Sequence, residues 1–134
     1  MTERESREQL IGYRLGQAGD ALTAARTLLT AGLYRDSVNR AYYAMFYAVL
    51  ALLTTRELGT SKHSAAIELF DREFVKTGVF PRESSKWLHA AFDQRLKGDY
   101  RELVVITREV AEGVVRDAET FVQRVRQSLP ADNR

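Results

Sequence analysis

One stretch of the chain, from Asp36 to Leu53, constrains the fold more than any other. Its polar side chains recur every three or four residues and form one thin stripe along a helix: Asp36, Arg40, Tyr43 and Tyr47. Small residues repeat at the same spacing beside that stripe, and bulky apolar residues occupy the remaining positions. A helix that is apolar nearly all round is a buried central helix, so this stretch predicts a helical protein packed around it.

Arg40 is the one cation within this apolar helix. Burying a charge is costly unless the charge is paired or lines a cavity. Two interpretations remain open: an ion pair with Asp36, supported by Tyr43, or contact with a ligand. Removing one partner of a buried ion pair costs about 3–5 kcal/mol, so we expect substitution of Arg40 to be harmful.

The length of 134 residues predicts a single domain, residues 1–134, with frayed ends at about 1–4 and 130–134. The chain has no cysteine, which excludes disulfides, thiolate metal sites and a cysteine nucleophile. The two histidines show no metal-ligand spacing, and we expect both to be surface or cap residues. We therefore expect neither a metal nor a cofactor. A net charge of +2 permits nucleic-acid binding without arguing for it.

No segment of the sequence has the character of a targeting or membrane-spanning element. The first eight residues are rich in charge and lack the apolar centre of a signal peptide. The apolar run from Ala41 to Leu53 is shorter than the roughly 18 residues that a membrane span needs. We expect a cytoplasmic protein without a membrane partner.

The remaining sequence predicts further helices joined by short connections. Helical periodicity, together with glycine and proline punctuation, predicts five helices at about residues 5–30, 34–57, 60–77, 81–98 and 100–128. Thr60 or Ser61 is the expected cap of the third helix, and Gly98 the expected end of the fourth. Asp99 followed by Glu102 resembles a capping box for the fifth. The predicted fold class is all-α, an up-and-down bundle of four to five helices.

The first helix carries an apolar seam and three interior glycines. The seam repeats in alternating steps of four and three residues: Ile11, Leu15, Ala18, Leu22, Ala25 and Leu29. Gly12, Gly16 and Gly19 lower helix propensity, and we expect them to allow close approach of a neighbouring helix. An apolar face left over on this helix would be a dimer interface.

Several blocks of the sequence resemble one protein family. Residues 36–46, with the run Arg40-Ala41-Tyr42-Tyr43-Ala44-Met45-Phe46, are similar to the signature helix of HEPN domains. The likeness continues, in the same order, through residues 61–64, 70–78 and 95–100. It covers about residues 19–125, and the first and last blocks together are quite specific.

The resemblance implies a helical bundle that is commonly a homodimer and is often encoded beside a minimal nucleotidyltransferase. Some members are metal-independent ribonucleases that act as toxins, and these carry an arginine followed, after four to six residues, by a histidine. Arg95 occupies the matching position here, but Tyr100 stands where the histidine would be. Catalytic activity is therefore left open, with Arg95 as the catalytic residue if the protein is a ribonuclease.

The block around residues 95–100 and the polar stripe supply the candidate nucleotide- or RNA-binding residues: Arg40, Tyr43, Arg95, Asp99 and Tyr100. An arginine beside a helix amino terminus can seat a phosphate, and Tyr100 could stack on a base. The structural alternative is that Asp99 caps the fifth helix while Arg95 pairs with it or with Asp93.

Three hypotheses follow. The leading one is a nucleotide- or RNA-binding partner of a minimal nucleotidyltransferase in a toxin–antitoxin-like pair, with Tyr100 a conceivable acceptor of a transferred nucleotide. The second is a ribonuclease toxin that uses Arg95 with a substitute histidine, such as His63 brought in from another helix or subunit. The third is a pure dimerisation or docking protein.

Overall fold

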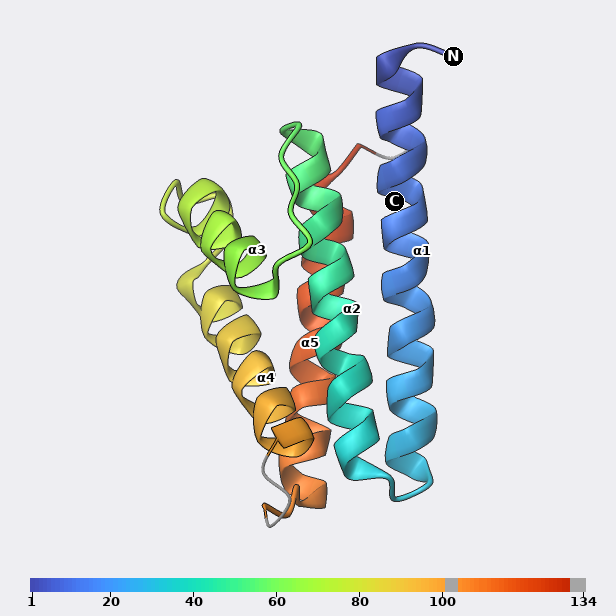
Figure 1. Ribbon diagram of the computed structural model, residues 1–134, viewed down its shortest axis with the longest axis vertical. Coiled ribbons are helices and arrows are strands. Elements are labelled where there is room, and N and C mark those ends of the chain that lie inside the picture. Colours follow the sequence, from blue (N-terminus) through green and yellow to red (C-terminus); the bar gives the residue numbers. More distant parts are fainter. Residues whose placement is uncertain (101–103, 131–134) are drawn as a thin grey trace.

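The computed structural model describes residues 1–100 and 104–130, apart from the side chain of Tyr100. Its elements, in chain order, are α1 (Glu3–Thr30), α2 (Tyr34–Thr55), α3 (His63–Phe70), the π-helical turn η1 (Asp71–Val75), α4 (Arg82–Tyr100) and α5 (Arg108–Ser128). The described residues contain no strand. Helices α1, α2, α4 and α5 run alternately down and up, and α3 with η1 forms a short arm beside them (Figure 1). The predicted all-α, up-and-down bundle is confirmed.

Helix α2 is the central element, as predicted. It contacts α1, α3, α4 and α5, and Figure 1 shows it between α1 and α4 with α5 behind it. Its buried residues lie on nearly every side of the helix: Ser37, Val38, Ala41, Tyr42, Ala44, Met45, Phe46, Ala48, Val49, Ala51, Leu52 and Leu53. Because each large apolar side chain contributes about 1.5–3 kcal/mol when fully buried, this helix dominates the core.

The apolar seam of α1 packs against α2, and its first five members are buried: Ile11, Leu15, Ala18, Leu22 and Ala25. The Ser37 hydroxyl reinforces the contact by donating to the Ala25 carbonyl at 2.8 Å. The interpretation of the glycines was wrong for Gly12 and Gly16, which are exposed, with open space where a Cβ would lie.

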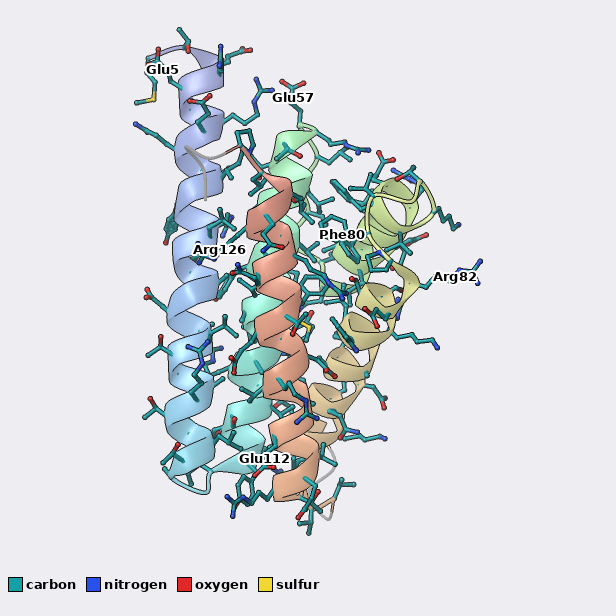
Figure 2. All side chains as sticks on the ribbon, turned by 180° about the vertical axis from the view of Figure 1, so that it is seen from behind. Glu5, Glu57, Phe80, Arg82, Glu112 and Arg126 are labelled. Carbon is teal, nitrogen blue, oxygen red and sulfur yellow. The ribbon has the colours of Figure 1, made fainter. Side chains whose placement is uncertain are left out.

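Gly19 alone has a close neighbour, the Arg126 guanidinium of α5, which would lie 3.2 Å from an added Cβ. Figure 2 shows Arg126 directed from α5 toward α1. There it donates to the Leu15 carbonyl at 3.0 Å. The close neighbour of this glycine is therefore a cation of the last helix, and not the alanine stripe of α2.

Helix α1 ends at Thr30, as predicted, and Gly32 lies just beyond its end. Gly32 has a φ of 78°, in the left-handed region that glycine favours. The Leu33 N–H donates to the Leu28 carbonyl at 2.9 Å, and the Gly32 N–H to the Leu29 carbonyl at 3.1 Å. This pair of bonds is a Schellman motif, which satisfies carbonyls that the helix end would leave free.

The third helix begins at His63, two to three residues later than predicted. The Thr60 side chain accepts from the Lys62 N–H at 3.1 Å, which stabilises the turn before the helix instead of its first residues. The third helix and η1 bury four residues: Ala66, Ile67, Phe70 and Phe74. After Phe70 the helix widens into η1, a feature that periodicity alone does not reveal.

The predicted boundary between the last two helices was wrong. Helix α4 continues through Gly98 to Tyr100, and α5 begins only at Arg108. Its cap is Thr107, whose side chain accepts from the Val110 N–H at 3.2 Å, so Asp99 does not cap it. Arg35 explains the extension, because it donates to the carbonyls of Gly98, at 2.6 Å, and Val104, at 2.7 Å. Glu102 lies outside the described residues.

Candidate functional site

The candidate site is a cluster of aromatic and cationic side chains where α2, the start of α3 and the last third of α4 meet. Helix α2 supplies Tyr42, Tyr43 and Phe46, α3 supplies His63, and α4 supplies Arg95. Tyr42 and Phe46 lie four residues apart, so both project toward α3 and α4 from one side of α2. We call these five residues the central cluster.

His63 is the most tightly surrounded residue of the central cluster. Its ring stacks on Phe46 with centroids 4.2 Å apart and planes 4° apart. It meets the Tyr43 ring edge-on at 5.5 Å. Its Nδ1 atom lies 2.7 Å from the Tyr42 hydroxyl. The expectation that His63 would be a plain surface or cap residue was therefore wrong.

The hydrogen bond between Tyr42 and His63 determines which ring nitrogen of the imidazole carries the proton. Tyr42 is fully buried, and burial raises the pKa of its hydroxyl, which Arg95 only partly opposes. Burial, and secondarily the Arg95 charge, lowers the pKa of His63. The Tyr42 hydroxyl has no other hydrogen-bond partner among the described residues, so we assign its proton to the bond with Nδ1 of a neutral imidazole, which leaves the ring proton on Nε2.

Arg95 is held over the two tyrosine rings. Its guanidinium carbon lies 5.6 Å from the centroid of Tyr42 and 5.4 Å from that of Tyr43, within cation–π range. Its Nε atom lies 3.0 Å from Oδ2 of Asp99, one turn along α4. That approach has poor hydrogen-bond geometry, however, and Nε has no hydrogen-bond partner among the described residues.

The Arg95 guanidinium is therefore both buried and incompletely satisfied. Only 15% of its side chain is exposed, and Nη2 reaches the Tyr43 hydroxyl at a long 3.5 Å. Native proteins satisfy nearly all of their buried donors, and an exception calls for a physical reason. Nε is closed off by the protein, whereas the weakly engaged Nη2 is a donor suited to an anion such as a phosphate.

Arg40 also lies over the ring of Tyr43. Its guanidinium carbon lies 4.7 Å from the Tyr43 centroid, and it donates to the Asn39 side chain at 3.2 and 3.3 Å. It is half-buried, and the expected pair with Asp36 is replaced by these contacts. Arg40 also lines a separate hollow of about 210 Å³ between α1 and α2, so the two arginines share Tyr43 but not one groove.

The structure thus brings four of the predicted candidates together: Arg40, Tyr43, Arg95 and Asp99. The side chain of Tyr100 lies outside the described part of the chain. The expected phosphate seat at a helix amino terminus beside Arg95 was wrong, because α5 starts at Arg108. Sequence reasoning missed Tyr42, and it named His63 only within the ribonuclease hypothesis, as a histidine brought in from another helix or subunit.

The described residues contain no group of three or more His, Asp or Glu side chains arranged to hold a metal ion. None of the described helices combines the length and apolarity needed to cross a bilayer.

The fold and the central cluster define a class: an all-α bundle whose buried central helix presents stacked aromatic rings to an arginine and a histidine. Residues 11–128 match the family model of the HEPN domain. The chain belongs to the HEPN domain family, as its resemblance to the signature helix implied.

The chain is also similar to proteins from bacteria and archaea. A UPF0332 protein of Thermotoga maritima is 40% identical over 123 residues, which is 92% of this chain and 93% of the relative. The protein named "Putative toxin MJ0605" of Methanocaldococcus jannaschii is 38% identical over 84% of this chain and 83% of its own length. "Putative toxin MJ0142" of the same organism is 32% identical over 87% and 80%.

Proposed function

We propose that this chain is a HEPN module that binds a nucleotide or RNA at the central cluster without cleaving it. The observation that carries the proposal is the Arg95 guanidinium, which is mostly buried, lies over two tyrosine rings and has an unsatisfied Nε. Such a group attracts an anion, and the rings beside it suit a stacked base. A nucleotide combines both chemistries in one ligand.

The state of His63 favours binding over cleavage. A ribonuclease needs a base that removes a proton from the ribose 2′-hydroxyl. The Nδ1 lone pair of His63 accepts from Tyr42, and Nε2 carries a proton, so the neutral ring offers a donor to the ligand and no free base. Tyrosine, with an ordinary pKa near 10, is a poor base at neutral pH. His63 therefore serves here as a hydrogen-bond donor to the ligand.

The ribonuclease alternative keeps one observation in its favour, the assembly of His63 and Arg95 in one cluster. In that case the hydrogen bond to Tyr42 would have to break, so that the imidazole could take the 2′ proton while Arg95 stabilised the phosphorane. The docking alternative predicts that neither RNA nor a nucleotide binds.

The role in the cell that we propose is one half of a toxin–antitoxin-like pair in the cytoplasm. Support comes from the names of the two archaeal relatives, which call them toxins, and from the association of such HEPN branches with a minimal nucleotidyltransferase. The partner would transfer a nucleotide from a nucleoside triphosphate to the Tyr100 hydroxyl: the hydroxyl oxygen bonds to the α-phosphorus, the bond from that phosphorus to the β-phosphate breaks, pyrophosphate leaves, and the hydroxyl proton passes to solvent. Mass spectrometry after co-expression tests this, and a chain that never gains a nucleotide contradicts it.

We further propose a homodimer. The homodimer is supported by an exposed apolar patch on α1, which is formed by Leu10 and Tyr13. Gly12 and Gly16 lie beside this patch and have no neighbour within the chain where a Cβ would lie. Analytical ultracentrifugation of the wild type and of Tyr13→Glu tests it. A dimer that Tyr13→Glu dissociates supports the proposal, and a wild-type monomer at micromolar concentration contradicts it.

The binding proposal is tested with a labelled RNA pool, scoring retention and cleavage separately. Arg95→Ala removes the proposed anion contact, and Arg108→Ala removes an exposed arginine of α5 as a matched control. We expect the wild type and Arg108→Ala to retain intact RNA and Arg95→Ala to lose it. Cleavage by the wild type that Arg95→Ala abolishes would favour the ribonuclease. No retention by the wild type would favour the docking protein.

A further inference from the structure

A second hollow lies beside the central cluster and is not used by the function proposed above. It has a volume of about 360 Å³ and is formed by α3, η1 and α4. This volume is at the lower end of the range for small-molecule sites, roughly 300–1,000 Å³. The residues that matter for its chemistry are Ile67, Asp71, Arg72, Lys76, His89 and Phe92.

One wall of the hollow is a preorganised polar group. The Asp71 carboxylate lies at the start of η1 and bridges two residues of α4. Its Oδ1 accepts from the Ser85 hydroxyl at 2.7 Å, and its Oδ2 lies 2.7 Å from Nε2 of His89. Because a carboxylate only accepts, His89 donates through Nε2.

The rim of the hollow carries two cations. Arg72 and Lys76 are exposed on η1 and directly after it, and neither side chain has an ion-pair or hydrogen-bond partner among the described residues. The opposing charges are those of Asp71, already engaged by Ser85 and His89, and of Glu68 on α3. The two cations are thus available to an anion at the edge of the hollow.

The floor of the hollow is apolar and is shared with the central cluster. Ile67 is buried and Phe92 is half-buried. The Phe92 ring also packs on Tyr42, with centroids 5.5 Å apart. Ser64, which lines the hollow, directly follows His63 in the chain. A ligand in the hollow would therefore be a near neighbour of a ligand at Arg95.

We propose that the hollow seats a second nucleotide unit of the same RNA strand, next to the unit held by Arg95. The base lies on Phe92 and Ile67, and the phosphate faces Arg72 and Lys76. This inference rests on the proposed function and deepens it, because it makes the ligand a single-stranded RNA of at least two nucleotides instead of a free mononucleotide. Flat apolar surface beside unpaired cations is the combination that single-stranded nucleic acid recognises.

The test compares affinities for a mononucleotide, a dinucleotide and a ten-nucleotide RNA. Phe92→Leu removes the aromatic face, and the double variant Arg72→Gln/Lys76→Gln removes the rim cations without touching the core. Arg108→Gln/Arg116→Gln removes the same charge from α5 and serves as the control. We expect both hollow variants to lose about tenfold or more in affinity for the dinucleotide and the longer RNA while their mononucleotide affinity is kept.

Salt dependence supplies an independent readout. The double variant should lower the slope of log affinity against log salt by about 0.7, as expected for one lost phosphate contact on a single strand. Hollow variants that bind every RNA as the wild type does would overturn this inference and leave the proposed function standing. A wild type that binds no RNA or nucleotide would overturn both.

Discussion

At the scale of the residue, Tyr42 decides the chemistry of the candidate site. It is fully buried, donates to His63, and lies under Arg95. One hydroxyl thus sets the tautomer of the only imidazole in the central cluster. The same arrangement that makes His63 a good donor toward a ligand makes it a poor base.

Replacing Tyr42 with phenylalanine tests this hydrogen bond. We expect Tyr42→Phe to lower the free energy of unfolding by about 1 kcal/mol, the usual net value of a buried hydrogen bond. Tyr43→Phe is the matched control, because its hydroxyl makes only a 3.5 Å contact with Arg95 and should cost less. Urea denaturation of the three proteins measures the difference. Equal stability of Tyr42→Phe and the wild type would refute the role of this bond.

The lowered pKa of His63 predicts how stability depends on pH. An unfolded histidine takes up a proton near pH 6.5, whereas folded His63 resists protonation because of burial and Arg95. The unfolded state therefore binds more protons below pH 6.5, and stability falls as the pH falls through this range. His63→Asn should flatten this fall. Urea denaturation at several pH values between 5 and 8 measures the free energy of unfolding. If its slope against pH is the same in His63→Asn as in the wild type, the assignment of this pH dependence to His63 is contradicted.

At the scale of the element, helix ends carry the clearest energetic consequences. We expect Thr107→Ala to cost about 1 kcal/mol, because the side chain of Thr107 caps α5. Thr107→Ser keeps the hydroxyl and should be nearly neutral. Thermal unfolding compares the two variants with the wild type, and equal stability of Thr107→Ala and Thr107→Ser would contradict the role of the Thr107 side chain as the cap.

Replacing glycine with alanine should have opposite effects on stability at Gly12, which lies within α1, and at Gly32, which lies just after the end of α1. Gly32 has a φ of 78°, so Gly32→Ala should destabilise by about 1 kcal/mol. Gly12 is exposed in the interior of α1 with nothing near an added Cβ, so Gly12→Ala should stabilise by about 0.5–1 kcal/mol. Chemical denaturation measures both, and changes of the same sign would contradict the backbone argument.

The helices were predictable from the sequence because their signals are local. The apolar periodicity that predicts α1 and α2 lies within these helices themselves. The glycines that mark the end of α1 and of the segment after η1, Gly32 and Gly78, lie directly beside the elements they end. The start of α5 was missed because the end of α4 depends on Arg35, 63 residues before Gly98 in the chain. A local pattern cannot report a contact of that kind.

At the scale of the whole molecule, the site is a product of the bundle. Arg95 and Tyr43 are 52 residues apart, and Tyr42 and His63 are 21 apart. The sequence indicated Arg95 and Tyr43 through a family resemblance, but it gave no means of placing His63 against Phe46 and Tyr42. Only the packing of α3 and α4 against α2 produces that geometry, and with it the second hollow behind Phe92.

The central claim is that His63 is a neutral Nε2–H donor in a site that binds RNA and leaves it intact. The measurement that tests it most directly is ¹⁵N NMR of the His63 imidazole at pH 7, before and after addition of a ten-nucleotide RNA. We predict a proton on Nε2 and none on Nδ1 in the free protein, and a shift of the Nε2 resonance when intact RNA binds. An unprotonated Nε2, a charged ring, or no response to RNA would contradict the account.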